Sequence, residues 1–173
     1  MSIRPAFDPA AVPVPPEPLE LLRTSVKPEW IDYNGHMNVA YYVLVFDHGT
    51  DGLFGIIDIG AEYVKRTNMS AFVLETHVQY IREVAEGAPL KMTGQVLDAD
   101  DKRIHLYSEL FHADEGFLSA TSELMLLHVD LGARGAAPFP PAVQARVDAI
   151  RTAHAGLPRP PAAGRVIGIR RRG

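Results

Sequence analysis

A single long apolar helix constrains the fold of this chain more than any other feature of its sequence. From Val39 onward, apolar side chains recur at three- and four-residue spacing, which predicts a helix from about residue 39 to about residue 58. The pattern is apolar on most sides, so we expect the helix to be largely buried. Gly49, Gly52 and Gly55 would weaken an exposed helix, and in a buried one they permit the close approach of another backbone.

Strand-type alternation of apolar and polar residues flanks this helix on both sides. Five runs show it, one before the helix and four after it: Leu19–Trp30, Ser70–Val84, Pro89–Ala99, Arg103–Ala113 and Phe117–Asp130. Residues 60–69 are expected to form a connector, and residues 142–153 a short amphipathic helix. Short turns between the last four runs predict an antiparallel meander.

This order of elements indicates an α+β fold. A curved antiparallel sheet of about five strands, wrapped around one long central helix, accounts for it. The edge strand of such a sheet is unprotected, so we expect it to pair with a second subunit.

Composition limits the architecture and the classes of partner. With 173 residues, 47% of them hydrophobic, the chain fits one globular domain, which we assign to residues 19–157. The proline-rich residues 1–18 are expected to form an extended arm. Residues 158–173 form a basic tail, either solvated or in contact with a phosphate-bearing ligand or partner. The net charge is −4, and without the four arginines of its last nine residues the chain has 13 basic and 21 acidic residues, or −8; this acidic body argues against nucleic acid as a partner.

Three absences from the sequence narrow the chemistry further. There is no cysteine, which excludes disulfides and thiolate catalysis. There is no apolar run long enough for a membrane span, so no membrane partner is expected. There is no secretory signal, so the expected location is the cytoplasm.

The polar segment 32–38 places a carboxylate just before the buried helix. Asn38 is expected to cap the helix, and Asp32 can fold back toward the helix start. The first amides of a helix are free donors with partial positive charge, which suits a carbonyl oxygen that becomes negative during acyl transfer. Asp32 would then act as a nucleophile or as a general base for water.

A structural interpretation of the same segment stays open. An Asp-x-x-Gly sequence before a helix is commonly just a capped turn, and a loop histidine such as His36 is commonly a hydrogen-bonded structural residue. In the catalytic interpretation, Asn38 holds the loop or donates to water or to the carbonyl. Neither interpretation needs a metal.

The segment from Trp30 to Tyr42, WIDYNGHMNVAYY, resembles the loop-and-helix signature of hotdog-fold proteins of the 4-hydroxybenzoyl-CoA thioesterase-like branch. That branch is in turn similar to plant acyl-carrier-protein thioesterases, whose loop reads Asp-x-Asn-x-His-x-Asn. The order of elements agrees over about residues 20 to 130. The resemblance maps the catalytic carboxylate onto Asp32, the oxyanion amide onto Val39 or a neighbour, and the helix-start asparagine onto Asn38.

The resemblance also implies partners. It implies a hotdog homodimer or homotetramer with active sites at subunit interfaces. It implies acyl-CoA as the substrate, so coenzyme A enters as part of the substrate and no separate cofactor is expected.

Three further stretches resemble betainyl-CoA thioesterases of carnitine degradation, some of which are fused to an L-carnitine dehydrogenase. They are residues 46–51, FDHGTD, residues 80–83, YIRE, and residues 167–170, IGIR. The chain has no dinucleotide-binding fingerprint, so it is expected to correspond to the stand-alone form.

A betainyl group carries a quaternary ammonium, which aromatic faces and carboxylates attract. Asp47 and Asp51 share one helix face and either recognise this cation or pair with His48, Thr50 or Arg82. The remaining candidates for substrate binding are polar or aromatic residues of the loop and the first helical turn: Trp30, Tyr33, His36 and Tyr41. Taken singly, such aromatics are more often core residues.

Two other functions stay open. Hotdog hydratases place an Asp and a His about five residues apart, and Asp32 and His36 are similarly spaced. A non-catalytic acyl-CoA sensor or scaffold on the same fold is the other alternative. Glu75, His77 and Gln79 share one face of a predicted strand and either reach the thioester or face solvent.

Overall fold

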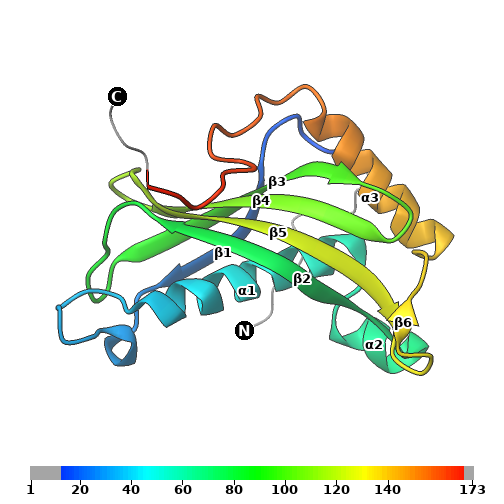
Figure 1. Ribbon diagram of the computed structural model, residues 1–173, viewed down its shortest axis with the longest axis horizontal. Helices are drawn as coiled ribbons and strands as arrows, with labels where there is room; N and C mark the ends of the chain where they lie inside the picture. Colours follow the sequence, from blue (N-terminus) through cyan, green and yellow to red (C-terminus); the bar gives the residue numbers. More distant parts are fainter. Residues whose placement is uncertain (1–12, 170–173) are drawn as a thin grey trace.

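Five strands form one curled antiparallel sheet, in the spatial order β1-β3-β4-β5-β2 (Figure 1). In the computed structural model, which describes residues 13–169, they are β1 (Leu19–Ser25), β2 (Met69–Tyr80), β3 (Pro89–Ala99), β4 (Arg103–His112) and β5 (Leu118–Asp130). A short strand, β6 (Gly135–Ala136), pairs with β5. The predicted α+β fold with a curved antiparallel sheet of five strands is confirmed. The predicted meander is found only for β3, β4 and β5, because β2 pairs with β5 at the edge of the sheet and β1 takes the place beside β3.

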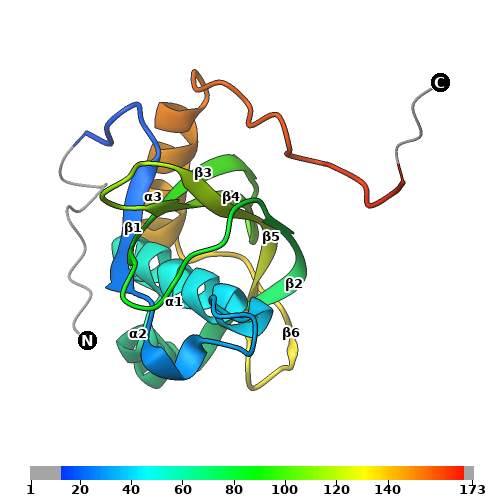
Figure 2. The ribbon, with the colours of Figure 1, turned by 90° about the vertical axis from the view of Figure 1, so that its left-hand side faces the viewer.

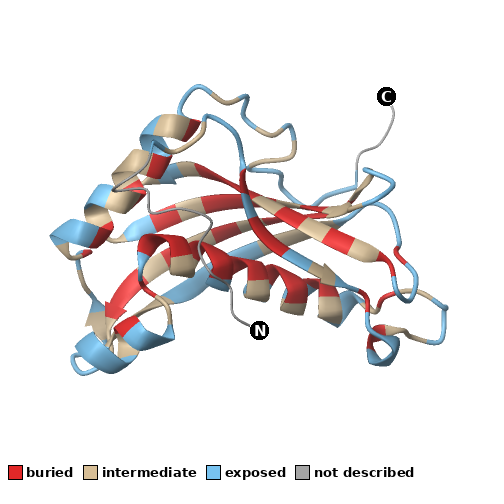
Figure 3. Ribbon diagram, turned by 180° about the vertical axis from the view of Figure 1, so that it is seen from behind, coloured by how far each residue is buried: buried red, intermediate tan, exposed pale blue. Residues whose placement is uncertain are grey.

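The long helix α1 (Val39–Ile57) packs into the concave face of this sheet, with bounds within one residue of those predicted (Figures 1 and 3). Asn38 caps it as predicted, because its Oδ1 accepts a hydrogen bond from the Ala40 amide at 3.0 Å. At the other end Asp58 adopts a left-handed conformation with φ of 62°. The buried side of α1 and the inner face of the sheet form one continuous apolar core.

Two glycines set how closely α1 approaches the sheet. A Cβ at Gly52 would overlap the backbone carbonyl of Leu21 in β1. A Cβ at Gly49 would overlap the side chain of Met92 in β3. The predicted close approach of another backbone is therefore found at Gly52, whereas Gly49 makes room for a side chain.

The first strand differs from its prediction in two ways. It ends at Ser25 rather than Trp30, because a 3-10 turn, η1 (Pro28–Trp30), begins at the proline. A register shift against β3 lies between Glu20 and Leu22, so Leu21 and Leu22 are both buried although simple alternation would separate them.

The second strand also ends earlier than predicted, at Tyr80 rather than Val84. The amides of Ile81 and Arg82 both donate to the Ser119 carbonyl, at 2.9 and 3.0 Å, which interrupts the regular ladder. The chain then leaves the sheet and passes beside the loop that precedes α1.

The predicted connector 60–69 contains a short helix, α2 (Ala61–Thr67), in which Tyr63 is buried. The hydroxyl of Tyr63 hydrogen-bonds to His128 Nε2 at 2.8 Å, so α2 is attached to β5. The predicted C-terminal helix is α3 (Pro141–His154), which packs on β3, where His154 Nδ1 accepts a hydrogen bond from the Val96 amide at 2.9 Å.

The segment after α3 crosses the sheet on the face away from α1 before it leaves the body of the protein (Figure 2). The Gly164 amide donates to Glu123 at 2.7 Å, and Arg165 donates to Gln79 at 2.9 Å. Residues 164–165, which fall in the predicted basic tail, are thus held against the sheet rather than loose. Residues 1–12 of the predicted arm and Arg170–Arg172 of the tail lie outside the described residues. In the part of the chain that the structure describes, no helix is long and apolar enough to cross a membrane.

Candidate active site

The loop that leads into α1 is a closed, hairpin-like turn. Ile31 and Met37 form an antiparallel bridge, and the Asp32 amide donates to the His36 carbonyl at 3.1 Å. Gly35 lies between them with φ of 82°, a conformation that glycine adopts without strain. The loop is therefore held by its own backbone, and its side chains project from a fixed frame.

The Asp32 carboxylate lies beside the start of α1, as predicted. One oxygen, Oδ1, accepts a hydrogen bond from the Asn34 amide at 2.8 Å. The other, Oδ2, is 3.5 Å from the Asn38 side-chain nitrogen, at the long limit of a hydrogen bond. Asn38 thus both caps α1 and faces Asp32, and one carboxylate oxygen keeps unused acceptor capacity.

An open cleft of about 510 Å³ runs along this loop. It is lined by residues 32–34 and 36–39 of the loop and helix start, by Tyr42 one turn into α1, and by Tyr80–Glu83 at the end of β2. The Ala40 amide is taken by the Asn38 cap, whereas across the described residues no acceptor is seen for the Val39 amide. Asp32 and a free helix-start donor therefore border one cavity.

Two tyrosines form an aromatic corner in the cleft. The rings of Tyr42 and Tyr80 lie 5.2 Å apart between centroids and meet at 80°. Tyr42 is 4% exposed and Tyr80 is 49% exposed. The Tyr80 hydroxyl donates to the Val39 carbonyl at 3.4 Å, which places this ring against the first turn of α1. Burial raises the pKa of both phenols, so both stay neutral at neutral pH.

The charges that border the cleft are mostly negative. Asp32 and Glu83 both line it, and Glu83 lies 3.9 Å from His36 Nε2. The Arg82 guanidinium is turned toward the neighbouring chain segment, 3.7 Å from Glu115 and stacked 3.7 Å over the Phe117 ring.

The aromatic residues predicted for the site are divided between the cleft and the structure around it. Trp30 is buried and stacks on Tyr41 with ring centroids 5.5 Å apart, so this pair joins the residue before the loop to the first turn of α1. Tyr33 lines the cleft with its ring almost fully exposed.

Asp47 and Asp51 are exposed on the outer side of α1 and do not line the cleft. Burial and the neighbouring Asp47 raise the pKa of Asp51. Neither Thr50 nor Arg82 is their partner, because Thr50 donates to the carbonyl of Phe46 in its own helix and Arg82 pairs with Glu115.

Glu75, His77 and Gln79 lie on the sheet face away from α1, where His77 pairs across from Glu123. They therefore cannot reach the cleft of their own subunit. Cleft residues that sequence reasoning did not assign to the site include Tyr42 of α1 and, at the end of β2, Tyr80 and Glu83. The stretch 80–83 was singled out only as a motif, and nothing local indicates that the strand ends at Tyr80 and that the next residues reach the loop.

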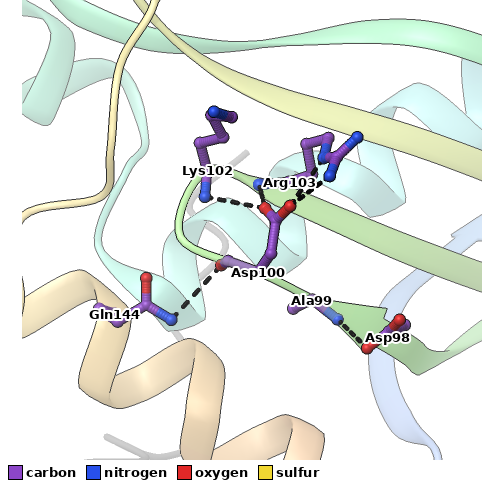
Figure 4. A network of polar contacts seen from close by, with 6 residues as sticks. All are labelled: Asp98, Ala99, Asp100, Lys102, Arg103 and Gln144. Atoms are coloured by element: carbon purple, nitrogen blue, oxygen red, sulfur yellow. Dashed lines mark hydrogen bonds and ion pairs between the residues drawn. The ribbon is translucent and has the colours of Figure 1, made fainter.

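A second acidic turn, between β3 and β4, offers a contrast (Figure 4). The Asp100 carboxylate accepts hydrogen bonds from the Lys102 amide at 3.0 Å, the Arg103 amide at 2.7 Å and Arg103 Nε at 2.8 Å. Gln144 of α3 donates to the Asp100 carbonyl at 3.4 Å. The Arg103 side chain lowers the pKa of Asp100 to about 2. Over residues 13–169, no group of three acidic or histidine side chains is placed to hold a metal ion.

Comparison with known proteins agrees with this geometry. A profile of the thioesterase-like superfamily matches residues 26–147. A betainyl-CoA thioesterase of Pseudomonas aeruginosa is 43% identical over 151 residues, 87% of this chain and 95% of its own length. An L-carnitine dehydrogenase/betainyl-CoA thioesterase of a Rhizobium species is 40% identical over 90% of this chain, which spans 31% of that longer protein.

Solved structures are similar over nearly their whole lengths. A Staphylococcus aureus protein in complex with CoA superposes with a TM-score of 0.82 at 25% identity, covering 88% of this chain and 97% of that one. A putative thioesterase of Pseudomonas putida superposes with a TM-score of 0.77 at 37% identity, covering 90% and 99%. The predicted hotdog fold and the resemblance to betainyl-CoA thioesterases are both confirmed.

Proposed function

The chain belongs to the thioesterase-like superfamily and hydrolyses acyl-CoA thioesters, and we propose that its own substrate is betainyl-CoA, which it cleaves to betaine and coenzyme A. We assign the reaction to the cleft beside the start of α1, because the Asp32 carboxylate borders the same cleft as the free Val39 amide. The curated relatives name the acyl group. The hydratase alternative needs His36 to act with Asp32, and among the described residues no hydrogen bond joins these two side chains; His36 Nε2 is 3.9 Å from Glu83.

In the proposed mechanism the thioester oxygen accepts a hydrogen bond from the Val39 amide, at the positive end of the α1 dipole. As a general base, Asp32 takes a proton from water while the water oxygen attacks the carbonyl carbon. The C–S bond then breaks, and the proton passes to the departing thiolate of coenzyme A. As a nucleophile, Asp32 would instead attack the carbonyl carbon, break the C–S bond with departure of the coenzyme A thiolate, and form an anhydride that water hydrolyses.

Isotope labelling distinguishes these two routes. In a single turnover in isotopically labelled water, the general-base route puts the label directly into betaine. The nucleophilic route, with water attacking the Asp32 carbonyl of the anhydride, delivers an unlabelled oxygen from Asp32 to the product and leaves the label on the protein. Label on Asp32 after one turnover therefore identifies the anhydride.

A substrate comparison tests the acyl group. The neutral isostere of betainyl-CoA is 3,3-dimethylbutanoyl-CoA, in which carbon replaces the ammonium nitrogen. We expect kcat/KM for betainyl-CoA to be higher by about tenfold or more, measured as release of free thiol. Equal turnover of the two thioesters would show that the enzyme does not select the cation. The same assay on Asp51→Asn tests whether Asp47 and Asp51 contribute to the preference for betainyl-CoA in the assembled oligomer.

We also propose that the active unit is a homodimer or homotetramer with active sites at subunit interfaces, in the cytoplasm. The edge strand β2 exposes Phe72, Val73 and Leu74 to 51%, 47% and 56%, an apolar run that an isolated sheet edge rarely carries. The cleft residues Tyr80–Glu83 continue directly from this strand. Light scattering on the purified protein measures the assembly, and a monomer with full activity would contradict the proposal.

A further inference from the structure

The small size of the betainyl group restricts where its cation can bind. One methylene separates the ammonium nitrogen from the thioester carbonyl carbon, so the two atoms are only about 2.5 Å apart by ordinary bond lengths and angles. The cation must therefore lie immediately beside the group that binds the carbonyl oxygen. In this chain that group is the Val39 amide, if the proposed function holds.

We propose that the corner between Tyr42 and Tyr80 is the binding site for the quaternary ammonium group, an inference that rests on the proposed function. The two rings meet at 80° with centroids 5.2 Å apart, and the 49%-exposed ring of Tyr80 is held against the buried Tyr42 and offers its surface to a small cation. The Tyr80 hydroxyl is bonded to the Val39 carbonyl, so the corner lies at the same helical turn as the free amide. No other aromatic pair borders the cleft among the described residues.

Electrostatics explain why an aromatic corner is needed there. The start of α1 carries partial positive charge, which suits the developing oxyanion but repels the neighbouring ammonium. Ring faces attract a quaternary ammonium without competing for the amide. Asp32 and Glu83 add negative charge along the same cleft, while Arg82 is occupied by Glu115 and the Phe117 ring.

The helix acids cannot serve this purpose within one subunit. Asp47 and Asp51 follow Val39 by two and more than three helical turns, about 12 and 18 Å along the axis at the rise of an α-helix. A cation about 2.5 Å from the carbonyl carbon is far from both. The acyl group is thus selected at the helix start.

The test compares two substrates in three variants. For Tyr80→Leu, which removes the ring, we expect the ratio of kcat/KM for betainyl-CoA to that for 3,3-dimethylbutanoyl-CoA to fall about 10- to 30-fold. For Tyr80→Phe, which keeps the ring, we expect the ratio to stay within about threefold of wild type. Phe111→Leu, which removes a half-buried ring on β4 outside the cleft, is the matched control and should leave the ratio unchanged.

Tetramethylammonium provides a readout that does not depend on betainyl-CoA. We expect it to inhibit hydrolysis of 3,3-dimethylbutanoyl-CoA competitively in the wild type, and much more weakly in Tyr80→Leu. The wild type can prefer betainyl-CoA while Tyr80→Leu lowers kcat/KM equally for both substrates. In that case the aromatic site is wrong and the proposed function stands. If the wild type shows no preference, the proposed function fails, and tetramethylammonium inhibition that depends on Tyr80 would still support the cation site. Absence of that inhibition would overturn it.

Discussion

Two turns of this protein begin in the same way and end in different chemistry. In each, an aspartate oxygen accepts a hydrogen bond from the backbone amide two residues later, Asn34 for Asp32 and Lys102 for Asp100. The third residue after the aspartate then differs. After Asp100 it is Arg103, which donates from its backbone and its side chain.

After Asp32 the corresponding residue is Gly35, which has no side chain to donate. Its left-handed backbone turns the chain back toward Asn38, and the carboxylate is left facing a cleft. A turn of this kind is therefore compatible with a structural carboxylate and with a reactive one. What separates a structural carboxylate from a reactive one is whether a neighbouring cation has used up its acceptor capacity.

The largest expected effect comes from Asp32. Asp32→Asn keeps the shape of the turn and removes the base, so we expect kcat to fall about 10³-fold. The free energy of unfolding should change by less than about 1 kcal/mol, because the residue is partly exposed and the amide oxygen can still accept from Asn34. Thiol release and denaturant unfolding measure the two quantities. Thiol release at the wild-type rate would remove Asp32 from the mechanism.

Asn38 should show an intermediate effect, because it belongs to both the helix and the site. Asn38→Ala removes the cap on the Ala40 amide and is expected to lower stability by about 1 kcal/mol. It also removes the donor near Asp32, and we expect kcat to fall about tenfold. Asn38→Ser is the matched control, since serine is also a good helix cap but its short side chain does not reach Asp32. Recovery of stability without recovery of kcat would separate the two functions, and full kcat in Asn38→Ala would contradict the second.

Asp100 should behave in the opposite way to Asp32. Asp100→Asn loses the ion pair with Arg103, and after allowance for solvent screening we expect a loss of about 1 kcal/mol in stability. We expect kcat to stay at the wild-type value, because this turn lies outside the cleft. A large fall in kcat would show that the two turns are not independent.

The smallest effect is the pH dependence of that same contribution. The pKa of Asp100 is lowered from 3.8 to about 2. Because the pKa of Asp100 is lower in the folded protein, its carboxylate contributes its full stabilisation above pH 3.8. This contribution is lost as the pH falls toward 2. The difference in unfolding free energy between wild type and Asp100→Asn should therefore shrink over this interval. A constant difference down to pH 2 would assign the loss to packing instead of charge.

The elements predicted correctly from the sequence are those whose information is local. The helix α1 follows from its apolar spacing, its start from the capping residue Asn38, and β3 from alternation between clear turn signals. Only one residue of α2, Tyr63, is buried, so its seven residues show too little periodicity to identify.

The parts of the site that could not be predicted depend on pairing between distant segments. Tyr80 reaches the cleft because β2 ends where Ser119 of β5 accepts two consecutive amides, a contact that spans about forty residues. Periodicity likewise placed Asp47 and Asp51 on one helix face, correctly, but could not say that this face looks away from the cleft. The reactive residues of the loop could be predicted because they are close together in the sequence. The residues around them could not, because they come from distant segments.

The two glycine contacts of α1 have different consequences for how this sequence can evolve. At position 49 the neighbour is the flexible end of the Met92 side chain, so a larger residue at 49 can be compensated by a smaller one at 92, and the two positions are free to covary. At position 52 the neighbour is the backbone of Leu21, and no second mutation removes a backbone carbonyl. Gly52 thus keeps α1, which carries the proposed oxyanion site at its start, in close contact with β1. We therefore expect changes in the accepted acyl group to come from residues that line the cleft and not from a larger residue at position 52.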